Sequence, residues 1–237
     1  MRVAVPVNDF STATLGALGV VAALFERERS GKGQLVETAL LHTALNFSDA
    51  ILIEQELLTA NRSAQKNRSW GSGPSDCFKT KDGWIFLMVI GPSQFKRWAR
   101  LVGNEETWLK DPRFRDDQTR GDHGDVLSEA MQAWCAQYTN EEALALLDRA
   151  RIPAGPIYTP QQTLDCAHIN AAGFLQRVEY PGMPKAAPLV QTPVKLSRTP
   201  ATIRNRAPVL GEHTETIMAG LGYNGAEIEE LRRNEVI

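Results

Sequence analysis

The amino-acid sequence predicts a mixed chain of helices and strands, of the α/β or α+β class. Three observations predict this: a long apolar segment with helix signals at both ends, a strand–turn–strand pattern around Asp82–Gly83, and further helix patterns after it. The chain has 237 residues, of which 43% are hydrophobic and 23% are charged. It is therefore long and apolar enough to bury a core, and its composition excludes a disordered chain.

The first predicted helix contains the longest apolar run, Leu15 to Phe25. Cations in its last turn and Gly31 just past it predict an end near Arg29. A membrane helix needs ~20 apolar residues, so we expect a buried core helix and no membrane association. Three residues in the polar stretch before the run are suitable N-caps: Asp9, Ser11 and Thr12.

The middle of the chain alternates between helix and strand patterns. Asp82–Gly83 between two β-type runs is a strong hairpin signal, and Thr139 with Glu142 forms a capping-box pattern. The highly charged residues 111–124 are expected to form a surface connection. The predicted elements are a short strand at 34–38, a helix from 37 or 38 to about 59, strands at 77–80 and 84–89, and helices at 92–103, 125–138 and 140–151.

The last third begins with a proline-rich turn at 151–160, and Thr159–Pro160 is a typical helix start. The elements expected after it are strands at 174–180 and 189–194 and helices at 212–221 and 225–234. Residues 76–180 are expected to form a compact α+β unit, whereas both chain ends have the pattern of parts of another domain.

Charge, cysteine and histidine usage exclude several classes of protein. Lys and Arg number 26 against 28 Asp and Glu, a net charge of -2 that argues against nucleic-acid and anionic-membrane partners. Three widely spaced cysteines fit neither a disulfide framework nor a zinc site, so we expect a cytoplasmic protein without a metal. No two histidines have the spacing of a metal pair: His42, His123, His168 and His213.

Asp9 is the residue with the clearest chemical potential. A carboxylate at a helix N-terminus lies at the positive end of the macrodipole, which favours its ionised form. It can then act as a nucleophile or a base, or simply cap the helix. Both interpretations are open on local evidence, although Ser11 and Thr12 can also cap.

The loop from Trp70 to Pro74 is the second candidate. Gly71 and Gly73, with Ser72 between them, let backbone amides approach a ligand such as an oxyanion or a thioester. The alternative is a plain loop before a hairpin. The spacing matches neither a dinucleotide fingerprint nor a P-loop, and no serine-hydrolase elbow is present.

Three stretches together resemble the class III CoA-transferases, the CaiB/BaiF family. The first stretch runs from Asn8 to Leu41. The second combines the hairpin turn with the later proline-glycine turn. The third begins at Ala207 and continues to the end of the chain. The resemblance covers the chain from about residue 3 to the end. The motifs that carry it are Asn8–Phe10, Glu26–Gln34, Val36–Leu41, Thr80–Trp84, Arg151–Ile157, Ala207–Thr214, Leu221–Tyr223 and Val236–Ile237.

The resemblance implies a fold of interlocked dimers. Residues 1–67 would belong to a large Rossmann-like domain and carry the nucleophile helix, residues 68–188 would be a linker and a small α+β domain, and residues 189–237 would return to the large domain. Family members carry an N-terminal nucleotide-binding half before the aspartate, which this chain lacks. A homodimer, or a complex with a separate N-terminal subunit, is therefore expected.

The resemblance also implies a reaction, the transfer of coenzyme A from an acyl-CoA to a carboxylic acid. Asp9 matches the family's nucleophile, which forms an aspartyl-CoA thioester. The family's glycine-rich loop closes over the intermediates, and Gly71, Ser72 and Gly73 look like a shorter counterpart of it. The implied partners are acyl-CoA and carboxylate molecules.

Two alternatives stay open. An acyl-CoA racemase or epimerase would use the same aspartate as an acid or base, but its partner histidine comes from upstream, and Gly91–Ser93 stands where racemases have a glutamate. A non-catalytic remnant would act as an interaction module that pairs with full-length homologues.

Overall fold

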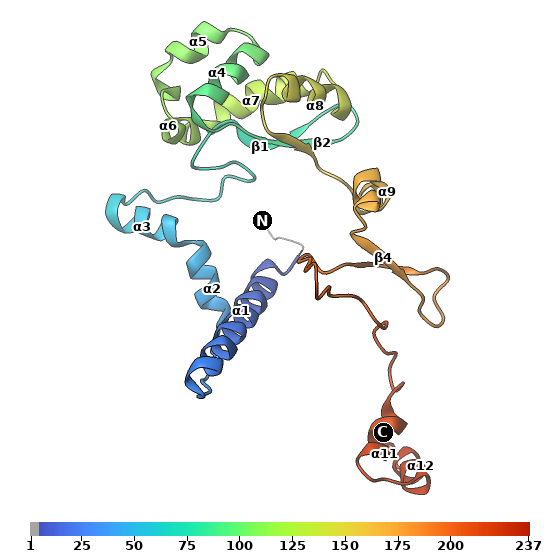
Figure 1. The fold of residues 1–237 in the computed structure, drawn as a ribbon. Coiled ribbons are helices and arrows are strands. Elements are labelled where there is room, and N and C mark those ends of the chain that lie inside the picture. Colours follow the sequence, from blue (N-terminus) through green and yellow to red (C-terminus); the bar gives the residue numbers. More distant parts are fainter. Residues whose placement is uncertain (1–4) are drawn as a thin grey trace. The chain divides into compact units, whose positions relative to one another are not determined.

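The computed structural model describes residues 5–237, which form two compact units joined between Pro156 and Ile157 (Figure 1). The chain is a mixture of helices and short antiparallel strands, as the α/β or α+β expectation required. The division into 1–67, 68–188 and 189–237, with both ends in one large domain, stays a prediction.

The first unit opens with a helical arm. Its helices are α1 (Val7–Ser30), α2 (Leu40–Phe47) and α3 (Asp49–Leu58). The predicted end of the first helix is confirmed: Gly31 adopts a left-handed conformation (φ 71°), and its N–H donates to the carbonyl of Arg27 at 2.8 Å. Only glycine takes this conformation without steric cost.

Three expectations for the arm are wrong. Residues 34–38 form no strand, because Val36 packs against α1 where Gly19 has no side chain: a Cβ there would lie 2.9 Å from Val36 Cγ1. The second helix is interrupted at Ser48, whose hydroxyl donates to the carbonyl of Ala44 at 2.9 Å and competes with the helical pattern. The apolar first helix is also not buried, since Thr12 is the single buried residue of α1 among the described residues.

The compact part of the first unit is a three-stranded antiparallel sheet covered by helices. Its strands are β1 (Ser75–Lys79), β2 (Trp84–Met88) and β3 (Ala154–Pro156), with β2 in the centre. The predicted hairpin is confirmed, and its register pairs Phe78 with Ile85. Its helices are α4 (Gly91–Val102), α5 (Glu105–Lys110), η1 (Pro112–Phe114), α6 (Asp117–Asp122), α7 (Gly124–Cys135) and α8 (Asn140–Arg149).

Helices α7 and α8 pack against this sheet, and α4 packs against α7. The strand alternation places Ile85 and Leu87 in the core and leaves Trp84 and Phe86 exposed, as period-two patterning requires. The capping box of α8 is confirmed by both of its hydrogen bonds, at 2.9 and 3.2 Å. Burial among core side chains raises the pKa of Cys135 to about 12, so this thiol is neutral at physiological pH.

Residues 111–124 are not a surface connection. They form η1 and α6, and they bury Phe114, Arg120 and Gly121. The Arg120 guanidinium donates to the carbonyl of Phe114 at 2.9 Å and to Asp117 at 2.5 Å, and it lies 4.6 Å from the centre of the Phe95 ring. Such a buried charge is tolerated because an anion, a carbonyl and an aromatic face all contact it.

The second unit contains short elements. They are α9 (Pro160–Asp165), α10 (Ala167–Ala171), the antiparallel strands β4 (Leu175–Val178) and β5 (Ala187–Val190), α11 (Thr214–Gly220) and α12 (Gly225–Arg233). All of them except α10 were expected within a few residues of these bounds. Arg206 and the N–H of Val209 hydrogen-bond Glu212, which lowers the pKa of that carboxyl to about 2.

In the first unit, Gly121 is the glycine with the closest surrounding atoms. A Cβ there would lie 1.9 Å from the carbonyl oxygen of Trp70 and 2.5 Å from its carbonyl carbon, and both are backbone atoms. We expect Gly121→Ala to destabilise the first unit by about 3 kcal/mol, as overpacking does. Urea unfolding followed by tryptophan fluorescence measures this.

Gly124→Ala is the matched control, because it also lies in a helix and its nearest neighbour, Arg68 Nη1, is 3.8 Å away. It should be neutral or slightly stabilising, since alanine favours helix. Equal unfolding midpoints for the two variants would contradict the packing described here.

Candidate functional site

Asp9 is the third residue of α1, and its side chain is exposed. The expectation that Asp9, Ser11 or Thr12 caps the helix is wrong. Pro6 is the N-cap residue, three residues before Asp9, and it makes no side-chain cap because proline has no side-chain hydrogen-bonding group. Among residues 5–237, the Asp9 carboxylate forms no hydrogen bond and no ion pair, so it is free for a ligand.

Asn8 and Thr12 hold the start of α1 around Asp9. The Asn8 side-chain amide donates to the carbonyl of Leu40 at 3.0 Å, which ties the start of α1 to the start of α2. The Thr12 hydroxyl donates to the carbonyl of Asn8 at 2.8 Å, and Thr12 is buried. These bonds fix the backbone on both sides of Asp9, and the positive end of the helix lies beside its carboxylate. Asn8 lies in the motif Asn8–Phe10, but its hydrogen bond to α2 was not predicted, although an amide next to the candidate nucleophile was a usable signal.

A hollow of about 250 Å³ lies against α1 at Leu15, and Asp9 does not line it. Its wall comes from α1, α2 and the extended segment between them. Leu15, Glu37, Thr38, Ala39, His42, Thr43 and Asn46 line it. His42 of this lining is exposed to solvent.

The loop at residues 71–73 is less open than its sequence predicts. Ser72 and Gly73 are buried, and Gly71 alone of the three is exposed. Gly73 also has a packing role, since a Cβ would lie 2.7 Å from the carbonyl oxygen of Arg120. Among residues 5–237, no hydrogen bond or ion pair joins Asp9 to this loop. Asp9, Gly71, Ser72 and Gly73 stay predictions as site residues.

An ion-pair cluster lies between the arm and this loop. Arg62 donates to Glu54 of α3 at 2.7 and 3.0 Å and to Asp122 of α6 at 2.6 Å, and it lies 5.2 Å from the centre of the Trp70 ring. The hydrogen bonds from Arg62 hold the pKa of Glu54 below its usual value. This cluster anchors the segment between α3 and the loop.

Within residues 5–237, no group of three His, Cys, Asp or Glu side chains is arranged to hold a metal ion. By length and composition alone, α1 is long and apolar enough to cross a membrane, a test that the core helices of soluble proteins also pass.

The model of CoA-transferase family III matches residues 1–214 of the chain. The chain belongs to this family. It is 30% identical over its whole length to the succinyl-CoA–D-citramalate CoA-transferase of Chloroflexus aurantiacus, and it covers 59% of that protein. It is 28% identical to the succinyl-CoA–L-malate CoA-transferase beta subunit of the same organism over 97% of the chain, and it covers 57% of that protein.

Solved structures share the fold of this family III chain. A CaiB/BaiF family protein from Brucella suis aligns with a TM-score of 0.70 and 24% identity over 93% of the chain and 57% of that protein. Rv3272 from Mycobacterium tuberculosis aligns with the same TM-score and 23% identity over 91% of the chain and 56% of that protein. The chain thus spans less than three fifths of the length of these relatives.

We expect Asn8→Ala to loosen the start of α2, because it removes the hydrogen bond to the carbonyl of Leu40. One such bond contributes about 1 kcal/mol, which corresponds to roughly fivefold faster local opening. Hydrogen–deuterium exchange of the peptide that spans residues 38–44 measures this change.

Asn46→Ala is the control, because Asn46 lies on α2, the helix whose start is measured. Asn46 is exposed and forms no side-chain hydrogen bond among the described residues. Equal exchange in the two variants would show that Asn8 does not tie α1 to α2.

Proposed function

We propose that this family III chain carries the nucleophile of a CoA-transferase, and that Asp9 is that nucleophile. The observation that carries the proposal is the Asp9 carboxylate, exposed in the first turn of α1 and without a partner among residues 5–237. The substrates we infer are an acyl-CoA donor and a carboxylic acid acceptor. The names of the relatives support this, since they pair succinyl-CoA or formyl-CoA with citramalate, malate or oxalate.

The proposed reaction has four steps on one carboxylate. Asp9 attacks the thioester carbonyl of the donor, which forms a mixed anhydride and releases the CoA thiolate. The thiolate attacks the aspartyl carbonyl, which gives an aspartyl-CoA thioester and frees the donor's acid. The acceptor carboxylate then displaces the thiolate to form a second anhydride. Attack of the thiolate on the acyl carbonyl of this anhydride gives the new acyl-CoA and regenerates Asp9.

The chain's own residues have separate parts in this proposal. The N-terminal end of α1 stabilises the carboxylate before attack, and Asn8 and Thr12 hold its backbone in place. Gly71, with the neighbouring Ser72 and Gly73, would approach the intermediates. The burial of Ser72 and Gly73 means that this approach requires the loop to move or to offer Gly71 alone.

We infer that the apolar surface of the arm is covered by a second polypeptide surface, in a homodimer or in a complex with an N-terminal subunit. Large side chains on several sides of α1 are exposed, including Phe10 (64%), Leu18 (64%) and Val21 (62%). Soluble proteins rarely expose a continuous apolar patch of this kind unless another surface covers it. The similarity to a beta subunit supports the second arrangement. The proposed complex is cytoplasmic, with both chain ends in its large domain.

Asp9→Asn should abolish covalent capture of an acyl group. The test mixes the chain with succinyl-CoA, alone and with the N-terminal half of a relative. Hydroxylamine then traps activated carboxylates, and peptide mass spectrometry finds the modified residue. We expect a hydroxamate at Asp9 in the wild type, and at least about 100-fold less in Asp9→Asn, because an amide is a far weaker nucleophile than a carboxylate.

Asp49→Asn is the matched control, because Asp49 is also an exposed carboxylate in the first turn of a helix, α3. It should leave the yield at Asp9 unchanged. A yield that survives Asp9→Asn would contradict the proposal. Exchange of the α-proton of a 2-methylacyl-CoA with deuterated solvent, without any hydroxamate, would favour a racemase instead. A stable complex without either reaction would favour an interaction module.

A further inference from the structure

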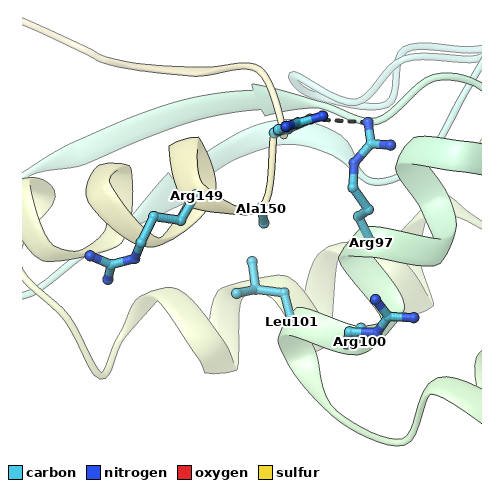
Figure 2. Close-up of a pocket in the computed structure, with 6 residues that line it drawn as sticks. Arg97, Arg100, Leu101, Arg149 and Ala150 are labelled. Atoms are coloured by element: carbon cyan, nitrogen blue, oxygen red, sulfur yellow. Dashed lines mark hydrogen bonds between the residues drawn. The ribbon is translucent and has the colours of Figure 1, made fainter.

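A cavity lined mostly by arginines lies in the compact part of the first unit, between α4 and the end of α8 (Figure 2). Its volume is about 560 Å³, within the range of small-molecule sites. Asp9 and the loop at residues 71–73 do not line it. The residues that line this arginine pocket are Arg97, Arg100, Leu101, Arg149, Ala150 and Arg151.

The folding of α4 and α8 explains why these side chains meet. Helix α4 buries Phe95, Trp98 and Ala99 in the core, which leaves Arg97 and Arg100 on the neighbouring face, three residues apart. The other arginines come from the last turn of α8 and from the turn after it. Arg151 has a positive φ of 54°, and its N–H donates to the carbonyl of Asp148 at 2.8 Å.

The charge of the pocket is only partly neutralised. Arg100 forms a bidentate ion pair with Glu105 at 3.0 and 3.1 Å, which lowers the pKa of Glu105. Within residues 5–237, the other three arginines form no ion pair: Arg97, Arg149 and Arg151. The carboxylate nearest to them in sequence, Asp148, is exposed and also forms no ion pair. Like charges around one cavity repel, so the arrangement favours an anion between them.

Arg97 is held in position before any ligand binds. Its Nη1 donates to the hydroxyl of Ser93 at 2.7 Å, and its Nη2 donates to the carbonyl of Arg151 at 3.1 Å, the bond drawn in Figure 2. These two bonds use two of the five N–H donors of the guanidinium. A side chain fixed in this way loses little entropy when it binds an anion.

The middle of the pocket is apolar. Leu101 and Ala150 face each other there, with Arg97 and Arg100 on one side of them and Arg149 on the other (Figure 2). A bare inorganic ion would not use this apolar area, whereas a phosphate ester with an organic portion would use both parts. Guanidinium groups match phosphate geometry because they donate two parallel hydrogen bonds.

We propose that the arginine pocket binds a phosphate-bearing small molecule at a site separate from Asp9. The phosphate binds where Arg97 and Arg151 meet, the charge of Arg149 adds to the positive potential from the other side of the pocket, and the organic portion lies on Leu101 and Ala150. A free nucleotide and the nucleotide portion of coenzyme A share this chemistry. The inference does not depend on the proposed function of Asp9.

The test measures binding of pyrophosphate, ADP and coenzyme A to the full chain by calorimetry at low salt. The double variant Arg149→Gln/Arg151→Gln should weaken binding at least about tenfold, since it removes a charged hydrogen bond from Arg151 and two positive charges from the pocket. The matched control is Arg113→Gln/Arg115→Gln, which removes the same charge from exposed arginines of the same unit. It should change affinity less than twofold.

Methyl NMR of the wild type gives a second measurement that does not depend on variants. Signals of Leu101 and Ala150 should shift on addition of ADP. Stronger binding of ADP than of coenzyme A indicates a free nucleotide, and equal binding indicates that either molecule is accepted. Absence of binding by all three probes would overturn the proposal, as would equal affinity in wild type and double variant. Binding of coenzyme A alone, lost in Asp9→Asn and retained in the arginine variant, would also overturn it.

Discussion

The exposed apolar surface of α1 is the constraint on which the rest of this structure depends. Among the described residues, this 24-residue helix packs against α2 and against Val36 and Thr38 of the extended segment between the two helices. Each exposed leucine, valine or phenylalanine would gain about 1.5–3 kcal/mol from full burial. A surface that covered α1 would therefore add substantially to the stability of the helix that presents Asp9. The proposed chemistry of Asp9 and the proposed assembly are connected in this way, because a nucleophile has to be positioned accurately.

The compact part of the first unit has a different character. Its core of Trp98, Leu127 and Met131 packs between the sheet and the helices, and Arg120 ties α6 to η1 and to Phe95. The carboxylate of Asp117 extends this tie, since it accepts the N–H of Gly91 at the start of α4 as well as the Arg120 guanidinium. This region buries its own apolar residues, so the arginine pocket lies on a rigid support. The two candidate sites thus differ in how much each needs an additional surface.

Local sequence signals predicted the elements whose causes are local. The Asp82–Gly83 hairpin, the capping box at Thr139 and the glycine stop at Gly31 depend on residues within a few positions of one another. The strand expected at 34–38 failed because a strand needs a partner, and this segment packs on α1 instead. The charged stretch at 111–124 failed because one of its arginines is buried and paired, which charge alone does not reveal.

The two candidate sites differ in the same way, because one has a local sequence signal and the other depends on the folded structure. Asp9 was identifiable from its place before an apolar helix, although the expected capping role was wrong because Pro6 begins the helix earlier. The arginine pocket was not identifiable, since its members lie on α4 and at the end of α8, which are far apart in the sequence. Two pairs of arginines close in sequence, Arg97 with Arg100 and Arg149 with Arg151, were the available signal.

Transfer of heavy oxygen from the acceptor to Asp9 is the most direct test of the central claim. The experiment uses an acceptor whose carboxylate carries the label. The enzyme preparation is one that catalyses the reaction, either the chain alone or the chain with the N-terminal half of a relative. Breakdown of the second anhydride leaves one acceptor oxygen on the nucleophile. Peptide mass spectrometry should therefore find label in the Asp9 carboxylate after turnover. Formation of the acyl-CoA product without label at Asp9 would contradict the account.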